Sequence, residues 1–304
     1  MDISVIIPTY NHAQSLKETL RTLSEQTGIE HLDYEIIVVD NNSRDETQTV
    51  VESYQKKFSG RLKRVIEIKQ GIAPARNRGI SEAKGRFLCF TDDDCQVSVD
   101  WLKRMHNNFI TFNPDVIQGK IIIATAIPKE KCLPEWFLKE RMANIDYLPA
   151  AGKLVHQDIV TANAGFKREL FDKFGKFSID PAFCINEDTE FSRRIAKKGV
   201  VKFYDPQIVA YHHFNIDRLD EKRILRQSYC WGRSRYFLEP VSIPRYRYFF
   251  YCLKEMTIKW LEYRKKKHQG DKMGAFLTIC KVSSLRGTIH QLLISLRQPK
   301  GAAL

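Results

Sequence analysis

Four short strand-like runs, most of them largely apolar, divide the first hundred residues, and they constrain the fold more than any other feature of the sequence. They cover residues 3–7, 34–39, 64–68 and 87–91. Near-continuous apolar runs of this length are typical of strands buried on both faces of a parallel sheet. Segments with helical spacing separate the runs. This β-α-β-α-β-α-β order predicts an α/β fold, with a mostly parallel sheet and helices on both faces.

Polar residues follow these runs where the predicted strands end. Pro8, Thr9 and Tyr10 follow the first run, Asp40 follows the second, and 92–94 follows the fourth. In such sheets the ligand crevice lies beyond the carboxyl ends of the strands, so these residues are expected to converge on one rim. The glycine pattern of a dinucleotide-binding fold is absent from the first turn, which weighs against a nicotinamide or flavin enzyme.

Three consecutive carboxylates, Asp92, Asp93 and Asp94, end the fourth run. Like charges this close repel one another and raise each other's pKa. A cation removes the repulsion, and clustered oxygen ligands suit Mg²⁺ or Mn²⁺, which are often shared with substrate phosphates. The alternative is a solvated acidic turn after a strand.

The middle of the chain continues the alternation less regularly. We expect a strand over 116–126, then a loop or short-helix insertion over the crevice at 129–158. Residues 159–168 are predicted to form a strand that leads into a helix, and 191–198 a further helix that Gly199 ends. Two short strands are expected at 200–204 and 208–213, the second ending in His212 and His213.

The net charge of +13 belongs almost entirely to the C-terminal part. Residues 215–304 hold 19 Lys and Arg against 7 Asp and Glu, whereas the first 214 residues are nearly neutral. No apolar run reaches the ~20 residues of a membrane span, and the N-terminus does not resemble a signal peptide. The seven cysteines show no CxxC spacing, which fits a reducing cytoplasm.

Seven sequence pieces, in order, resemble those of the family 2 glycosyltransferases, which have the GT-A fold. They are Val5-Ile6-Ile7-Pro8-Thr9-Tyr10-Asn11, Val38-Val39-Asp40-Asn41-Asn42-Ser43, Ala75-Arg76-Asn77-Arg78-Gly79, Thr91-Asp92-Asp93-Asp94, Asn163-Ala164-Gly165-Phe166-Lys167-Arg168, Glu187-Asp188 and Tyr211-His212-His213. The resemblance covers about residues 1–214. It implies an enzyme that transfers a sugar from a nucleotide-sugar, UDP being the commonest nucleotide.

The resemblance also implies a metal site for Mn²⁺ or Mg²⁺, which would neutralise the charge that develops on a diphosphate leaving group. By the family pattern Asp94 ligates the metal, and Asp92 points toward the donor ribose or the metal. Asp93 shares either role. His212 resembles the histidine that completes the site in many members, although the sequence leaves His213 open as the ligand. The alternative for both is two ordinary histidines at a strand end.

The donor-binding set implied by the resemblance lies at the first three motifs. Asp40 would accept a hydrogen bond from the N–H of a pyrimidine base, beside the backbone of Pro8, Thr9 and Tyr10. Asn42 belongs to the same set. Arg76 and Arg78 would approach the diphosphate, near the free N–H groups of a helix start, although Arg78 is also typical of a surface charge. Asp40 can also act as a turn-forming residue, and both roles can hold together.

The pair Glu187 and Asp188 is implied to be catalytic. Asp188 would be the base that deprotonates the acceptor hydroxyl as it attacks, and Glu187 would orient the donor sugar. Inversion at the sugar carbon comes from the family alone. The structural alternative is an acidic pair at a helix start, which the helix dipole favours.

One departure separates this chain from the processive, membrane-embedded relatives, which carry Gln-x-x-Arg-Trp. The nearest match is Gln227-Ser228-Tyr229-Cys230-Trp231, with Cys230 in place of the arginine. This difference predicts transfer of one sugar and not polymerisation.

We therefore divide the chain into a catalytic domain at 1–214 and a basic, helical extension at 215–304. Aromatic and basic residues alternate over 246–267, as in helices that bind an anionic bilayer surface. This indicates a cytoplasmic protein, peripheral on the inner face of the plasma membrane. The alternatives are a helical appendage or dimer contact and nucleic-acid binding, but no recognition motif supports the last.

The function predicted is single-sugar transfer to a glycan or lipid-linked acceptor in surface polysaccharide or glycolipid biosynthesis. A nucleotidyltransferase acting on sugar phosphates is one alternative, but the Gly-rich, basic loop usual in that class is missing after Ile7. A degenerate, non-catalytic binding subunit is the other. The retention of Asp40, Asp92, Asp94 and Asp188 together weighs against it.

Overall fold

The computed structural model describes residues 1–131, 133–239 and 242–297. The chain forms two compact units. The first comprises Met1–Ser178 and Asp188–Asn215, and the second comprises Ile179–Glu187 and Ile216–Leu304. The segment 179–187 thus leaves the first unit and returns to it at Asp188.

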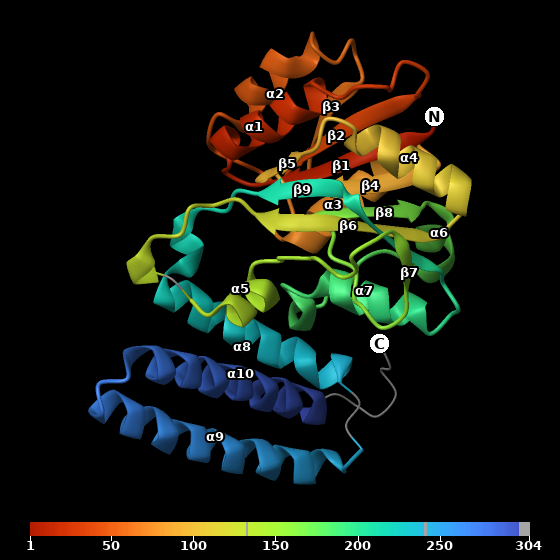
Figure 1. Ribbon diagram of the computed structural model, residues 1–304. Helices are drawn as coiled ribbons and strands as arrows, with labels where there is room; N and C mark the ends of the chain where they lie inside the picture. The colour runs from red at the N-terminus through yellow and green to blue at the C-terminus, as the bar shows by residue number, and fades with distance from the viewer. Residues whose placement is uncertain (132, 240–241, 298–304) are drawn as a thin grey trace. The chain divides into compact units, whose positions relative to one another are not determined.

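The first unit is built on a mixed sheet whose N-terminal half is parallel (Figure 1). Its four strands pair in the order β3-β2-β1-β4, all parallel. They are β1 (Ile3–Thr9), β2 (Tyr34–Asp40), β3 (Leu62–Ile66) and β4 (Phe87–Thr91). Every residue of β1, β2 and β4 is buried, as the unbroken apolar runs predict.

Three helices connect these strands. They are α1 (Ala13–Ser24), α2 (Thr47–Gln55) and α3 (Ile72–Glu82). In α3, Gly79 lies so close to β1 that a Cβ there would stand 2.4 Å from the side chain of Ile6. This close contact brings α3, and with it Arg76, tightly against the sheet.

The second half of the sheet continues through β4-β8-β6-β9-β5, with β7 paired to β9. These strands are β5 (Cys95–Val97), β6 (Val116–Ile123), β7 (Gly152–Leu154), β8 (Asn163–Lys167) and β9 (Lys202–His212). β8 is antiparallel to β4 and β6, while β9 is parallel to β6. The two short strands predicted at 200–213 form one strand, because β6 pairs with both parts across a register shift at Gly119 and Lys120.

The remaining helices of this unit include α4 (Trp101–Phe112) and α6 (Glu169–Phe174). The predicted insertion contains η1 (Lys129–Lys131) and α5 (Glu135–Arg141) as well as β7. α7 (Glu187–Ala196) begins at the catalytic pair predicted from the sequence. Its Phe191 stacks on Phe171 with ring centroids 4.8 Å apart, within a buried aromatic cluster that anchors the helix.

The second unit is helical. It contains η2 (Pro181–Phe183), η3 (Ile216–Leu219), α8 (Glu221–Leu238), α9 (Arg245–His268) and α10 (Lys272–Arg297). α8 and α10 approach closely at Gly232 and Gly287, where a Cβ would collide with the backbone of the facing helix. Among the described residues, none of the helices combines the length and the apolar character that crossing a bilayer requires.

Candidate active site

The carboxyl ends of β1, β2 and β4 lie together, as predicted. Thr9 pairs with Asp40 at the ends of β1 and β2, and β4 runs parallel to β1 on its other side. The three aspartates begin one residue beyond β4. The sheet topology therefore gathers these polar residues at one edge.

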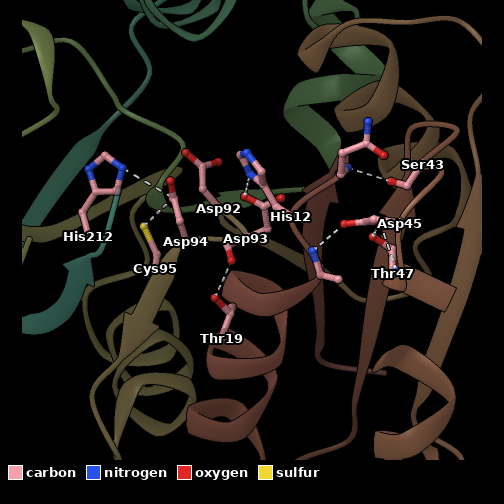
Figure 2. Close-up of polar contacts among 12 residues, drawn as sticks. His12, Thr19, Ser43, Asp45, Thr47, Asp92, Asp93, Asp94, Cys95 and His212 are labelled. Carbon is pink, nitrogen blue, oxygen red and sulfur yellow. Dashed lines mark hydrogen bonds and ion pairs between the residues drawn. The ribbon is translucent and has the colours of Figure 1, made fainter. Parts of the chain in front are cut away.

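His212 lies beside Asp94 (Figure 2). The pairing of β5 with β9 sets Cys95 opposite His212, and the N–H of His213 donates to the Asp94 carbonyl at 2.8 Å. His212 Nε2 is 3.4 Å from Asp94 Oδ1, and both side chains are buried. His213 points outward and is exposed. Of the two histidines that the sequence left open, the structure brings His212 to the carboxylate.

The other ring nitrogen of His212 lies 3.0 Å from the carbonyl oxygen of Met142. A carbonyl can only accept, so His212 Nδ1 carries the proton and donates it. In the neutral ring, Nε2 then presents its lone pair to the Asp94 carboxylate. Such a backbone contact on the second nitrogen is the usual way that a metal-binding histidine is oriented.

The donor atoms at this point fit a divalent cation. Ligand atoms of Asp94, Cys95 and His212 lie within 4.8 Å of one another, and all three residues are buried. A lone pair that faces a carboxylate is unfavourable unless a cation or proton lies between them. A carboxylate oxygen and an imidazole nitrogen are both ordinary ligands of divalent metal ions. The predicted ligand Asp92 is not in this group.

Asp92 instead pairs with Arg76. The Arg76 guanidinium is 2.8 Å from Asp92 Oδ1, and the arginine side chain is almost fully buried. Arg78 lies two residues further along α3. It pairs with Glu82, and its side chain is 45% exposed, as expected of a surface charge. The structure therefore places Arg76, and not Arg78, within the carboxylate cluster.

Asp93 turns to a different neighbour from Asp94. Its Oδ1 lies 3.3 Å from His12 Nδ1, and its carbonyl accepts from the Thr19 hydroxyl (Figure 2). Burial raises the pKa of the Asp93 carboxyl, the His12 hydrogen bond opposes this, and the Asp94 charge adds to the rise. The three aspartates thus have three different surroundings.

Asp40 is buried at the end of β2 and holds the turn that follows. It accepts from the Ser43 N–H at 2.8 Å and from Arg64 Nε at 2.9 Å. Asn42 is exposed and adopts a left-handed backbone with φ 63°. The turn-forming role of Asp40 is therefore present in the structure. Tyr10 is exposed beside this turn, while Pro8 and Thr9 are buried in β1.

Asp188 at the start of α7 belongs to the same electrostatic cluster as Arg76 and Asp92. Burial raises the pKa of the Asp188 carboxyl, the Arg76 charge opposes the rise, and the Asp92 charge adds to it. Asp188 Oδ2 lies 3.3 Å from both the N–H and the hydroxyl of Thr161. Its neighbour Glu187 is buried and belongs to the helical unit.

Several residues of this site were not predicted from the sequence. They are His12, Arg64, Cys95, Met142 and Thr161. Met142 acts through its backbone carbonyl and leaves no signal in the side chain. Cys95 directly follows the aspartates and is the first residue of β5, so the signal was that position.

Comparison with known proteins identifies the family. The sequence model of glycosyl transferase family 2 matches residues 4–175, more than half of the chain. The chain therefore belongs to glycosyl transferase family 2. The predicted family and enzyme class, a glycosyltransferase, are confirmed.

The curated relatives match only part of their own length. The chain is 28% identical over 173 residues to glycosyltransferase AglE of Haloferax volcanii, covering 55% of this chain and 57% of AglE. It is 33% identical over 103 residues to the poly(ribitol-phosphate) beta-N-acetylglucosaminyltransferase TarS of Staphylococcus aureus, covering 34% of this chain and 18% of TarS.

Solved structures confirm the GT-A fold class. Mannosyltransferase PcManGT from Pyrobaculum calidifontis, in complex with GDP-Man and Mn²⁺, aligns with TM-score 0.63 and 18% identity over 95% of this chain and 86% of that chain. TarS 1–349 of S. aureus, in complex with UDP-GlcNAc, aligns with TM-score 0.57 and 17% identity over 99% of this chain and 93% of that chain.

Proposed function

We propose that this protein transfers a single sugar from a nucleotide-diphospho-sugar to a hydroxyl of a glycan or lipid-linked acceptor. The observation that carries the proposal is the cluster of Asp94 with His212 and of Arg76 with Asp92 at the carboxyl edge of the sheet. It offers a metal-ligand pair and a buried cation, which is what a departing diphosphate requires. Two structural neighbours were solved with nucleotide-sugars, which supports the substrate class.

The metal-binding residues in this proposal are Asp94 and His212, with Asp92 shared between the metal and the donor ribose. When bound, Mn²⁺ or Mg²⁺ supplies positive charge to the two phosphates. PcManGT was solved with Mn²⁺, which favours that ion for this chain as well. Asp93, buried against His12, supports the loop that carries the other two aspartates.

The donor base and ribose are assigned to the turn after β1 and β2. Pro8, Thr9 and Tyr10 provide the backbone and the exposed ring on one side, and Asp40 and Asn42 provide polar atoms on the other. Asp40 has four acceptor positions, of which the Ser43 N–H and two nitrogens of Arg64 use three. A base N–H can therefore be added without displacing the turn. UDP is our preferred donor nucleotide.

Asp188 is assigned as the general base. It takes the proton of the acceptor hydroxyl while the acceptor oxygen bonds to the sugar C1 and the bond from C1 to the diphosphate breaks on the opposite face, which inverts the carbon. A raised pKa makes a carboxylate a better proton acceptor. The two contacts from Thr161 fix its orientation. Glu187, next to it in the chain, would orient the donor sugar.

Two parts of the chain have separate tasks in this proposal, with catalysis in 1–214 and attachment in 215–304. The exposed aromatic and apolar side chains of α9 include Tyr246, Phe250, Tyr251, Trp260 and Leu261, all more than 40% exposed. Basic residues 264–267 follow at its C-terminal end. This combination supports binding to an anionic membrane surface. Such binding would bring the enzyme, on the cytoplasmic side, close to a lipid-linked acceptor in glycolipid or surface polysaccharide biosynthesis.

Cosedimentation with anionic liposomes at low salt tests the membrane assignment. Full-length protein should pellet, and reversal of Lys265, Lys266 and Lys267 to glutamate should release it. Reversal of Lys197 and Lys198, exposed at the end of α7, is the matched control and should change little. Wild-type protein that stays in the supernatant would exclude the assignment.

Thermal shift with UDP, GDP, CDP and dTDP, each with and without Mn²⁺ or Mg²⁺, tests the donor site. A ligand that binds only the folded protein raises the melting temperature. We expect one nucleotide to act, only with metal, and Asp94→Asn to abolish the effect. No shift with any nucleotide would favour a degenerate binding subunit. Release of pyrophosphate on turnover would favour a nucleotidyltransferase.

A further inference from the structure

Two cysteines of the helical unit face one another. Cys184 follows η2 in the segment 179–187, and Cys230 lies in the middle of α8. Both are free thiols in the structure, Cys184 exposed and Cys230 half-buried. They interact through a hydrogen bond between their side chains. Cys230 is also the residue that replaces the arginine of the processive motif, and the proposed transfer reaction makes no use of it.

The packing around this pair is specific. Asn186 donates to the Ser234 hydroxyl at 2.5 Å, and the rings of Phe183 and Phe237 lie 5.5 Å apart. Cys230, Ser234 and Phe237 are spaced i, i+4 and i+7, so they share one face of α8. The short segment 183–186 therefore packs along this face, and its register on α8 sets the two thiols opposite each other.

The local charge activates one thiol of the pair. The hydrogen bond from Cys184 and the nearby charges of Arg226 and Arg233 lower the pKa of Cys230 to about 6, although burial opposes this. The same hydrogen bond and burial raise the pKa of Cys184. Cys230 is thus the thiol whose surroundings favour the nucleophilic thiolate, and Cys184 is the thiol that donates to it. The other described cysteines, Cys89, Cys95, Cys252 and Cys280, are buried.

We propose that Cys184 and Cys230 form an oxidisable dithiol, whose disulfide ties segment 179–187 to α8. The oxidant class is a small disulfide such as oxidised glutathione. The Cys230 thiolate attacks one sulfur and releases one glutathione thiolate, which leaves a mixed disulfide. Cys184 then loses its proton, attacks the Cys230 sulfur and releases the second glutathione. Two protein thiols are oxidised and one glutathione disulfide is reduced to two thiols.

The proposed disulfide lies close in sequence to the proposed catalytic pair. The segment that it fixes continues directly into Glu187 and Asp188, the first residues of α7. The disulfide would remove the freedom of 179–187 to separate from α8 by local unfolding. The site itself is assigned from the geometry of the helical unit and does not depend on the proposed sugar transfer.

Mass spectrometry of the full chain incubated with oxidised glutathione tests the proposal. We expect the wild-type protein to lose about 2 Da with no retained adduct, because the second thiol displaces glutathione. Peptide mapping should join the peptides of Cys184 and Cys230. A persistent glutathione adduct on the wild type, or pairing of either cysteine with another thiol, would overturn the proposal.

Two single variants separate the roles of the thiols. Cys184→Ser keeps a hydroxyl donor beside Cys230 and should trap a mixed disulfide on Cys230, since no second thiol displaces it. Cys230→Ser should react with glutathione at Cys184 much more slowly. Amide hydrogen exchange over 179–187 should slow on oxidation in the wild type and not in Cys230→Ser. Equal adduct formation in the two variants would contradict the assigned roles.

Discussion

Buried carboxylates at the two edges of the parallel sheet have pKa values shifted in opposite directions. At the amino edge, Glu35 on β2 accepts from the Ser4 hydroxyl and the Lys84 N–H at 2.7 Å each, and pairs with Lys63 at 3.0 Å. Burial alone would raise the pKa of Glu35, but these partners outweigh it and lower the pKa. At the carboxyl edge, the pKa values of Asp93 and Asp188 are raised.

This difference distinguishes a carboxylate that stabilises the fold from carboxylates that are proposed to act in catalysis. Glu35 is an ion that the fold satisfies completely, and its negative charge stabilises the folded state. The carboxyl edge holds several carboxylates at a cost, because burial and mutual repulsion are only partly offset by Arg76 and His12. Buried carboxylates whose pKa is raised in this way are typical of functional sites, where a bound ligand provides the missing charge partner.

The largest effect that distinguishes the two edges is expected from Asp188→Asn. Removal of the proposed general base should lower turnover by roughly 10²–10⁴-fold, because proton removal from the acceptor is lost. Stability should hold or rise, since a buried group with a raised pKa no longer has to ionise. Steady-state kinetics and thermal melts measure both quantities. Turnover within a fewfold of the wild type would contradict the role of Asp188.

The metal pair gives the next largest effect. His212→Ala should weaken Mn²⁺ binding by roughly tenfold or more, because a ligand and its backbone-fixed orientation are lost together. The exposed neighbour provides the matched control, and His213→Ala should bind the metal nearly as the wild type does. Isothermal titration with Mn²⁺ alone measures this. The reverse order of the two variants would move the site to His213.

The pH dependence should differ between the edges. If Asp188 is the base, as proposed, its protonated form is inactive, so kcat/KM should fall as pH drops through a pKa above the ordinary value of about 3.9. The folded-state pKa of Glu35 is lowered, so its stabilising contribution is complete above the unfolded-state pKa near 4.3 and is lost only as pH falls further. Activity should therefore decline above the ordinary pH range of an aspartate, and the Glu35 contribution should be lost below the ordinary range of a glutamate. A pH–rate profile and melts across the same range compare them.

The smallest effect is expected at the amino edge. Glu35→Gln should lower the free energy of unfolding by about 1–3 kcal/mol, because the amide leaves buried donors from Ser4, Lys63 and Lys84 imperfectly paired. Turnover of the folded enzyme should hold. The exposed Glu52→Gln on α2 is the control and should change stability little. Denaturant unfolding measures the difference. A large loss of turnover in Glu35→Gln would contradict a purely structural role for Glu35.

The sequence predicted those features that depend on a local pattern of residue types. The apolar runs predicted β1, β2 and β4, because strands buried on both faces are mostly apolar. The polar exceptions Ser4 and Glu35 hydrogen-bond to each other. Their ends predicted where Asp40 and the three aspartates gather. The choice between His212 and His213 needed the pairing of β9 with β5, since adjacent strand residues point to opposite faces. The partners Met142 and Thr161 come from distant segments and act in part through backbone atoms, which leave no pattern in the sequence.

The most direct test of the central claim measures product release and binding in the same two proteins. Wild type and Asp188→Asn are incubated with Mn²⁺ and a panel of UDP-sugars and GDP-mannose, and the released nucleotide is identified by chromatography. We predict slow, metal-dependent release of a nucleoside diphosphate by the wild type, with water as acceptor. Asp188→Asn should lose this release but keep the metal-dependent thermal shift with that nucleotide. Equal release by both proteins, or pyrophosphate as the product, would contradict the proposed transfer.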